Sequence, residues 1–580
     1  MSNTTVKSSK PTYVFALGGI EEIGKNMYVF EHDNEIYIVD CGIKFADENE
    51  LLGVNCVICP FDYLVENKDK IKGLIITHAH EDHIGGIPYL LKTLPIENIY
   101  ASPLAAGIIS KKLKEHSDLN KFTMVKFNDD TIIKSKHFEI EFFRVCHSIP
   151  MSYGLSLTTI NGTIVSTGDF RFDFSAKVDQ TDIHKICDIS KKGVDLLLCE
   201  TTNAEAPGFS TSEKYALDEI RRRIIRAPGR VFITTFASNL GRIENIIEIA
   251  LNLKRKVCII GKSMDANIST SIACGCLKTF KTDFIEPAQI NNYSDQEVVV
   301  LLTGSQGEPT AALNMMANGK YPHIFLKPSD TILMSSNPIP GNFSQVERLI
   351  NKLTKANISI IKNSATVKLH ASGHATQTEL HLMIKLINPK YIMPIHGEFK
   401  MLSAMESNVD FLGIKKEQYI QVVNGQKIKL EDHNVEATNI FIDTEEVYVD
   451  GKKINIDSSK LLSARKVLSQ DGIFNVTIVV DRKGKKIIGL PSIITRGCFF
   501  ANTSLSLISK ISYALRDDIE AEMKKNVRPI NNLIIRKIAE NTVGYYIWKN
   551  KNKKPLVRVT VFDKFEQTNK QQETKEEKAE

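Results

Sequence analysis

The stretch Thr77-His78-Ala79-His80-Glu81-Asp82-His83 is the strongest signal in the sequence, because it places three histidines and an aspartate within six residues. It follows the apolar segment 74–76, a predicted strand, so the imidazoles of His78 and His80 are expected to point to the same side and share one metal ion. Asp82 and His83 begin the next predicted helix and can reach a second metal ion. The alternative interpretation is a surface histidine cluster that binds no metal.

Two metal ions need more ligands than this stretch supplies, and the chain places further candidates directly after other predicted strands. The candidates are His147 after residues 140–145, Asp169 after residues 163–167 and His396 after residues 391–395. A carboxylate can bridge two cations, and we expect Asp169 to be the bridge. Because functional sites are often built where the chain leaves a sheet, the site is predicted at one edge where these strands end.

The order of the predicted elements indicates that one domain is inserted into another. Up to about residue 205, short strands dominate and long helices are few, which is typical of a sheet-rich α/β sandwich. From about residue 211 helices and strands alternate, which favours a doubly wound parallel unit. The first pattern returns in the strand 391–395, so the predicted fold class is α/β with an insertion.

A hairpin, two helices and a final strand predict a small α/β domain near the C-terminus. The tail that follows is rich in Lys, Glu and Gln and is expected to be disordered. The predicted boundaries are 1–10 for a disordered N-terminal tail, 11–205 and 361–445 for the two parts of the sandwich domain, 206–360 for the insert, 446–460 for a linker, 461–562 for the C-terminal domain and 563–580 for a disordered tail.

The composition is that of an ordinary globular protein and limits the classes of function. Of 580 residues, 42% are hydrophobic and 24% charged, and no apolar run approaches the roughly 18 residues of a membrane-spanning helix. The net charge of +6 permits a nucleic-acid partner without proving one. Ten scattered cysteines and the polar N-terminus predict a cytoplasmic protein with reduced thiols. The single C-x-x-C pair, Cys56 and Cys59, has no second pair at zinc-finger spacing.

Further motifs follow one another along the chain. They are Leu17-Gly18-Gly19 with Glu22-Ile23-Gly24-Lys25-Asn26-Met27, His147-Ser148-Ile149-Pro150, Thr202-Asn203-Ala204-Glu205 with Pro207-Gly208-Phe209, Thr235-Phe236-Ala237-Ser238-Asn239, Thr303-Gly304-Ser305-Gln306-Gly307-Glu308-Pro309, Ser372-Gly373-His374, and Pro394-Ile395-His396-Gly397-Glu398. With these motifs the chain resembles the metallo-β-lactamase-fold hydrolases that carry a β-CASP insertion, and more narrowly the bacterial ribonuclease J family, over about residues 11–562. The resemblance implies a metallo-β-lactamase αββα sandwich with an inserted doubly wound β-CASP domain and a small C-terminal α/β domain.

The resemblance implies two zinc ions per subunit that share the carboxylate of Asp169. The implied ligands are His78, His80 and His147 for one zinc ion and Asp82, His83 and His396 for the other. Asp40 is implied to lie behind these ligands and to orient one of them. A metal-bound hydroxide would then attack the phosphodiester, so no serine or cysteine nucleophile is needed.

The resemblance also assigns catalytic roles. Besides Asp169, the implied catalytic residues are His374, placed near the scissile phosphate, and Glu200, which would keep His374 oriented and protonated. Many members of the family have Asp at the position of Glu200, and Asp is also expected in place of Met151. The chain therefore departs from the family pattern at both positions.

Substrate-binding residues are implied in two places. The stretch His370-Ala371-Ser372-Gly373-His374 is similar to the family's phosphate-binding turn, where a hydroxyl and exposed backbone N–H groups suit an anionic oxygen. Ser238, Asn239 and Arg242 resemble the part of the insert that contacts RNA phosphates or the 5′ end. Loop chemistry and helix capping are the alternative interpretation of these three residues.

The implied function is that of a zinc-dependent ribonuclease with 5′-to-3′ exonuclease activity, a preference for a 5′ monophosphate, and endonuclease activity, acting in RNA maturation and mRNA decay. The implied partners are RNA, further copies of the chain in a homodimer or homotetramer assembled by the C-terminal domain, and other RNA-decay or ribosomal proteins. One alternative is a DNA-processing β-CASP nuclease. Another is a small-molecule metallohydrolase such as a thioesterase or lactonase, which leaves the insert and His374 unexplained.

Overall fold

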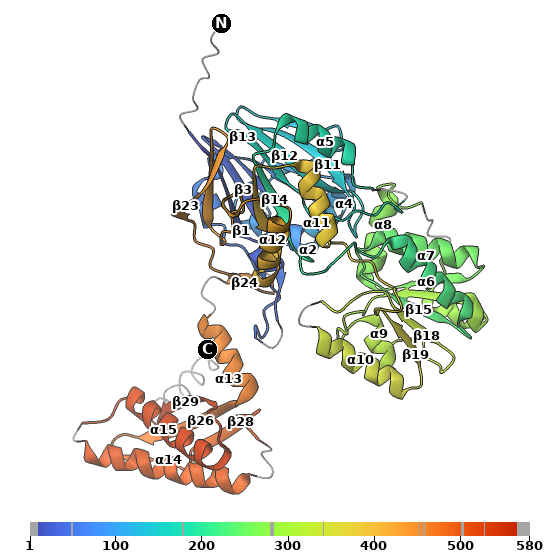
Figure 1. Ribbon diagram of the computed structural model, residues 1–580. Helices are drawn as coiled ribbons and strands as arrows, with labels where there is room; N and C mark the ends of the chain where they lie inside the picture. The colour runs from blue at the N-terminus through green and yellow to red at the C-terminus, as the bar shows by residue number, and fades with distance from the viewer. Residues whose placement is uncertain are drawn as a thin grey trace, which may run out of the picture. The chain divides into compact units, whose positions relative to one another are not determined.

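The computed structural model describes residues 10–47, 50–176, 179–278, 284–339, 342–451, 453–455, 459–499, 504–526 and 528–564. Most of the two tails predicted to be disordered, residues 1–9 and 565–580, lies outside these residues. The chain forms two compact units (Figure 1). The first comprises Met1–Phe45 and Asn55–Val449, and the second comprises Ala46–Val54 and Asp450–Glu580.

Two mixed sheets form the centre of the first unit. The first sheet runs in the order β23 (Asn434–Phe441), β22 (Gln426–Glu431), β1 (Thr12–Gly18), β3 (Met27–His32), β4 (Glu35–Val39), β7 (Ile71–Ile75), β8 (Asn98–Ala101) and β9 (Thr123–Lys126). The second runs in the order β10 (Ile132–Lys134), β11 (Glu139–Val145), β12 (Ser152–Thr159), β13 (Gly162–Ser166), β14 (Leu196–Glu200) and β20 (Tyr391–Ile395).

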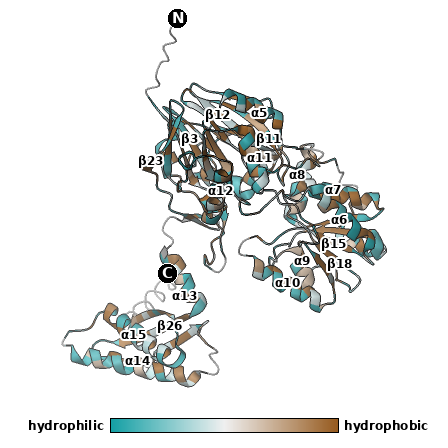
Figure 2. Ribbon diagram, viewed as in Figure 1, coloured by the Kyte–Doolittle hydropathy of each residue, from teal (hydrophilic) through white to brown (hydrophobic). Residues whose placement is uncertain are grey.

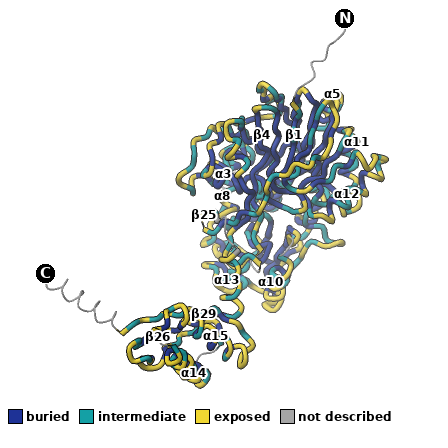
Figure 3. The backbone as a smooth tube through the Cα atoms, turned by 90° about the vertical axis from the view of Figure 1, so that its left-hand side faces the viewer, coloured by how far each residue is buried: buried dark blue, intermediate teal, exposed yellow. Residues whose placement is uncertain are grey.

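Alternation along the strands explains why these sheets pack in layers. In β14, Leu196 and Leu198 join the core shared with the first sheet, whereas Leu197 and Cys199 join a core on the opposite face. Helices α5 (Ile183–Lys192), α11 (Gln377–Ile387) and α12 (Phe399–Phe411) cover that opposite face. On the first sheet, α4 (Pro103–Leu113) packs against β8 and β9. The predicted αββα sandwich is therefore confirmed, with buried residues running along the strands (Figure 3).

The insert is the doubly wound unit that the sequence predicts. Its five strands are all parallel, in the order β16 (Lys256–Ile260), β17 (Val298–Leu302), β15 (Val231–Thr234), β18 (Thr331–Met334) and β19 (Ser359–Lys362). Helices α6 (Glu213–Arg226) and α7 (Leu240–Asn252) lie on one face, and α9 (Ala312–Ala317) and α10 (Phe343–Lys355) on the other (Figure 1). Figure 2 shows the same separation, with apolar strands between helices whose outer surfaces are hydrophilic.

The insertion point brings distant residues of the sandwich together. The chain leaves the second sheet after β14 and returns in β20, which pairs with β14 in parallel so that Glu200 is the register partner of Ile395. On the other side of β14, Ser166 of β13 is the register partner of Leu198. Because parallel strands end at the same edge, Asp169, Glu200 and His396 emerge side by side.

The second unit contains the predicted hairpin and helices. Its sheet runs β27 (Lys486–Ile487), β26 (Ile473–Asp481) and β28 (Ser492–Arg496), with β29 (Leu556–Asp563) parallel to β26. Helices α14 (Leu505–Lys525) and α15 (Asn532–Lys551) bury their apolar sides in one core with β26. None of the helices in the described part of the chain has the length and apolar character that crossing a membrane requires.

The structure shows part of the predicted linker and the state of the cysteines. The predicted linker 446–460 includes a strand, β24 (Val447–Asp450), which pairs with β6 (Cys56–Ile58) because Val447 and Val449 are buried on one side. Residues 456–458 of that linker lie outside the described residues. All ten cysteines are free thiols, and Cys59 of the C-x-x-C pair donates to the carbonyl of Lys25.

Candidate metal centre

All seven predicted metal ligands meet at one edge of the sandwich. They follow the ends of β7, β11, β13 and β20 or lie on the short helix α2 (Glu81–Ile84). The structure brings them together in two groups that share Asp169, each with ligand atoms within 4.8 Å of one another. The groups are His78, His80, His147 and Asp169, and Asp82, His83, Asp169 and His396.

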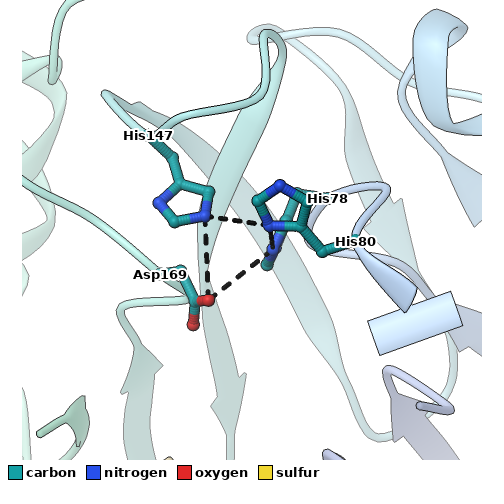
Figure 4. Close-up of side chains that lie close together, drawn as sticks. All are labelled: His78, His80, His147 and Asp169. Atoms are coloured by element: carbon teal, nitrogen blue, oxygen red, sulfur yellow. Dashed lines mark hydrogen bonds and ion pairs between the residues drawn. The ribbon is translucent and has the colours of Figure 1, made fainter. Parts of the chain in front are cut away.

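The first group surrounds a small space into which imidazole nitrogens point (Figure 4). Nδ1 of His80 lies 3.0 Å from Nε2 of His78 and 3.1 Å from Nε2 of His147. Oδ2 of Asp169 is 3.6 Å from the His78 nitrogen and 3.8 Å from the His147 nitrogen. Separations of this size between donor atoms suit a cation placed among them.

The second group is built around the same carboxylate. Nε2 of His83 lies 3.3 Å from Oδ2 of Asp169 and 3.5 Å from Oδ2 of Asp82. Nε2 of His396 is 3.2 Å from the same Asp82 oxygen, and Nδ1 of His396 is 3.1 Å from Oδ1 of Asp169. Asp169 therefore faces both groups, as the sequence predicts for a bridging ligand.

Three of these imidazoles are oriented by hydrogen bonds at Nδ1, the ring nitrogen that faces away from the site. Nδ1 of His147 donates to the carbonyl of Gly373 (2.7 Å), and Nδ1 of His83 donates to Oδ2 of Asp40 (2.7 Å), so Nε2 of each ring faces the site. The hydroxyl of Thr77 donates to Asp40 and lies 3.0 Å from Nδ1 of His78, which orients that ring in the same way. Such outer partners fix the tautomer that a metal needs.

The backbone around the site leaves no room for extra atoms. A Cβ at Gly373 would lie 2.8 Å from the His147 ring, and one at Gly42 would lie 1.6 Å from the carbonyl oxygen of Asp82. Asp40 and His396 both have left-handed backbone conformations, with φ of 62° and 53°. Positive φ values at non-glycine residues cost energy and cluster at functional sites.

The pKa values of the histidines differ between the two ligand groups. Burial lowers the pKa of His78 and His147 well below the usual value and that of His80 to about 4, so these imidazoles are neutral and offer lone pairs. Burial acts in the same direction on His396, but Asp169 outweighs it and raises the pKa of His396 to about 10. Burial would raise the pKa of Asp169, but His396 and His83 hold it well below its usual value. In the first group, neutral imidazoles lie beside an ionised carboxylate, which is a donor set that fits divalent metals, and we assign the cluster as a metal-binding site.

The predicted pair of His374 and Glu200 is present. Oε2 of Glu200 lies 2.7 Å from Nδ1 of His374, and Oε1 accepts a hydrogen bond from the backbone N–H of Phe170 (2.8 Å). Burial lowers the pKa of His374, but Glu200 outweighs burial and raises it above the usual value. One carboxylate oxygen of Glu200 therefore reaches His374, while the other stays hydrogen-bonded to the backbone next to Asp169.

Arg242 is placed differently from the prediction. Its guanidinium is buried, and all five N–H groups have acceptors within the protein, so in this arrangement none points to an RNA phosphate. The acceptors are both carboxylate oxygens of Glu213 (2.7 and 2.8 Å), the carbonyls of Ser335 (3.0 Å) and Ala371 (2.9 Å), and Nδ1 of His370 (2.7 Å). Arg242 thus anchors the turn 370–374 to the insert.

The remaining substrate-binding candidates occupy the same region. Asn239 caps α7, because its side-chain oxygen accepts from the backbone N–H of Arg242 (3.3 Å), as the alternative interpretation expects. Ser372 accepts a hydrogen bond from Asn203 (2.9 Å). Ser238 lies directly before the cap, at the C-terminal edge of the insert's sheet. At Met151 the backbone N–H donates to Asp179 (3.3 Å), whose carboxylate comes from another segment.

Three supporting residues were not predicted from the sequence. Thr77 and Thr202 contact the histidines that are candidate metal ligands, and Glu213 binds Arg242. Thr202 donates to the carbonyl of His396 (3.1 Å) and lies 3.2 Å from its Nδ1. Thr77 could have been found, because it directly precedes His78. Glu213 had no such signal, since its partner Arg242 lies 29 residues away along the chain.

The fold and the site define a metallo-β-lactamase-fold hydrolase with a β-CASP insert, and comparison with protein families agrees. Residues 21–181 match "Metallo-beta-lactamase superfamily", and residues 228–353 match "Ribonuclease J, beta-CASP domain". Residues 344–422 match "Zn-dependent metallo-hydrolase RNA specificity domain", and residues 460–564 match "Ribonuclease J C-terminal domain".

Curated relatives narrow the class to one family. The chain is 48% identical to ribonuclease J of Mycoplasma genitalium over 551 residues, which cover 94% of this chain and 96% of that protein. It is 38% identical to ribonuclease J 1 of Streptococcus pyogenes (96% and 98% covered) and 34% identical to ribonuclease J2 of Bacillus subtilis (95% and 98% covered). The chain belongs to the ribonuclease J family.

A solved structure supports the fold alone. A crystal structure of a protein of unknown function from Enterococcus faecalis aligns with a TM-score of 0.52 at 17% identity. The alignment covers 74% of this chain and all of that chain.

Replacing Asp40 by Asn tests the hydrogen bonds that orient the ligands. The carboxylate accepts from His83 and the Thr77 hydroxyl with one oxygen and from the Thr77 backbone N–H with the other. The amide has only one accepting oxygen and cannot keep all three bonds, so we expect metal affinity to fall about 10- to 100-fold. Competition with a chromogenic chelator measures the affinity. Asp130→Asn, an exposed change in the same domain, serves as the control, and an Asp40→Asn chain that binds metal as tightly as this control would contradict the assignment.

Replacing Glu213 by Gln tests whether Arg242 holds the turn 370–374. Gln cannot accept two charge-assisted hydrogen bonds from the guanidinium, so the turn should shift and kcat/KM on RNA should fall roughly 10- to 100-fold. The control is Glu219→Gln on the same helix, whose partners Arg222 and Arg223 are more exposed. Equal kinetics for the two variants would show that Arg242 does not position the turn.

Proposed function

We propose that this chain is a zinc-dependent ribonuclease that removes nucleotides in the 5′-to-3′ direction, prefers a 5′ monophosphate, and also cuts RNA internally. The observation that carries the proposal is the pair of ligand groups sharing Asp169, with His374 and Glu200 beside them. One zinc ion would be held by His78, His80, His147 and Asp169. The other would be held by Asp82, His83, His396 and Asp169.

When bound, two such cations would lower the pKa of a bound water and offset the charge that develops on the phosphate. The chain's own residues supply the rest of the chemistry. Nδ1 of His374 is held by Glu200, so Nε2 is free to donate a proton to the leaving oxygen as the phosphodiester bond breaks. The Phe170 N–H keeps Glu200 in place during this transfer.

A phosphate-binding site in the insert would account for the preference for a 5′ monophosphate. In open parallel sheets, ligands bind beyond the carboxyl ends of the strands. Thr235 and Ser336 follow the ends of β15 and β18 there, next to Ser238 and Asn239 at the start of α7. Among the described residues, the hydroxyls of Thr235 and Ser336 are buried without a hydrogen-bond partner, so they can bind phosphate oxygens that enter the site.

Family membership favours RNA over the two alternatives. A small-molecule hydrolase would need the metal ligands but not the insert, the turn 370–374 or the buried hydroxyls. A DNA nuclease would use the same site, but the relatives named above are ribonucleases J, and residues 344–422 match an RNA specificity domain.

The proposal extends to assembly and cellular role. The C-terminal domain, residues 461–562, would join chains into a homodimer or homotetramer, which the exposed apolar side chains of Ile494 and Phe562 support. The enzyme would act in the cytoplasm on RNA maturation and mRNA decay.

A time course on 3′-labelled RNA tests the activity. We expect metal-dependent shortening of RNA that carries a 5′ monophosphate, slower shortening of the 5′ triphosphate form, and loss of activity with a chelator or in His80→Ala. Internal cuts that are indifferent to the 5′ group would make the chain chiefly an endonuclease. Failure to cleave either RNA, with DNA or a thioester cleaved instead, would refute the proposal.

The double substitution Thr235→Val and Ser336→Ala tests this phosphate-binding site in the insert. It removes two hydroxyls and keeps their approximate shapes, so the preference for a 5′ monophosphate should shrink about tenfold, while cleavage of RNA with a 5′ hydroxyl stays the same. Thr331→Val, at the opposite end of β18, is the matched control. A preserved preference in the double variant would place the 5′ phosphate elsewhere.

A further inference from the structure

The outer side of α15 has features that the metal site does not use. The helix buries Ile535, Ala539, Val543 and Ile547 in the core of the second unit. These residues recur every three to four positions, so they define one side of the helix and leave the opposite side to solvent.

The solvent side carries aromatic rings among lysines. Lys537, Asn541, Tyr545 and Trp548 are spaced by four, four and three positions, so they share one surface. Tyr545 is 53% exposed and Trp548, the single tryptophan of the chain, is 54% exposed. We call the surface formed by Lys537, Asn541, Tyr545, Trp548 and Lys549 the α15 face.

The second half of α15 and the segment that follows it in the sequence are basic. From position 541 to position 562 the sequence contains no acidic residue. It contains five cations, namely Lys549, Lys551, Lys553, Lys554 and Arg558. The whole chain has a net charge of only +6, so this stretch is unusually basic.

The cations and the rings are held together. On the α15 face, Nζ of Lys549 lies 5.4 Å from the centre of the Tyr545 ring. Cation–π contacts of this kind keep positive charge beside aromatic surface.

We propose that the α15 face binds single-stranded RNA, with bases stacked on Tyr545 and Trp548 and phosphates contacted by the lysines. Single-stranded nucleic acid matches both features at once, because it offers flat bases to the rings and a negative backbone to the cations. A protein partner would use the rings but would not call for a stretch free of acidic residues. The choice of RNA rests on the proposed function, and it adds an RNA contact in a unit separate from the metal site.

Fluorescence of Trp548 tests the proposal directly, because no other tryptophan contributes. The full chain is titrated at low salt with an oligouridylate in a chelator, so that the RNA is not cut. We expect saturable quenching, weaker apparent affinity as salt rises, and no quenching by inorganic polyphosphate, which has charge but no bases. A fluorescent label on the RNA reports total binding in the same titration.

Variants separate the α15 face from other RNA contacts. Tyr545→Ala should weaken the affinity reported by Trp548 about tenfold, and Lys537→Glu with Lys549→Glu should weaken it further. The matched control is Lys524→Glu with Lys525→Glu, the same charge change at the end of α14, which should leave quenching unchanged.

Three outcomes would overturn the proposal. The first is RNA that binds according to its own label while Trp548 emission stays constant. The second is quenching that none of the α15 face variants alters. The third is emission that changes with protein concentration in the absence of RNA, which would make the face a contact between copies of the chain. A chain that cleaves no RNA yet shows Trp548 quenching would refute the proposed activity and leave the RNA contact standing.

Discussion

The buried carboxylate of Asp169 is the feature on which the site depends. It is 3% exposed, and its oxygens lie within 3.8 Å of nitrogens from His78, His83, His147 and His396, which come from three separate segments of the chain. The carboxylate is negatively charged and is surrounded by nitrogen atoms of four imidazoles. This buried arrangement is stable only if protons or cations occupy the space between the oxygens and the nitrogens. The hydrogen bonds from Asp40, Thr77 and Gly373 turn Nε2 of three of these rings toward that space, and so they favour a cation.

The insertion of one domain into another completes the site. Because β13, β14 and β20 run parallel, Asp169, Glu200 and His396 leave the sheet at the same edge although the insert separates the last two. The chain returning from the insert forms the turn 370–374, which contributes His374 and the carbonyl that accepts from His147. Arg242 and Glu213 fasten this turn to the insert, so the position of the insert's sheet and the geometry at the metal ligands are coupled through buried hydrogen bonds.

The metal ligands could be predicted because each follows a strand whose apolar pattern is visible in the sequence, and the order of helices and strands revealed the insert. Arg242 could not be placed in this way. An arginine near a phosphate-binding motif suits an RNA contact or a buried ion pair equally well, and the outcome depends on Glu213 and His370, which are 29 and 128 residues away. The strand β24 within the predicted linker was missed for a similar reason, since its pairing partner β6 lies far away in the sequence. Long-range pairing of this kind has no local sequence signal.

Metal content after loss of Asp169 shows whether this carboxylate is a ligand of both metal ions. Metal bound per chain is measured by elemental mass spectrometry for the unaltered chain and for Asp169→Ala, after loading with zinc and removal of free metal. A shared ligand predicts that occupancy falls at both positions together. Retention of one metal ion at full occupancy in Asp169→Ala would contradict the claim, because that ion would then be held without the carboxylate that both groups are built around.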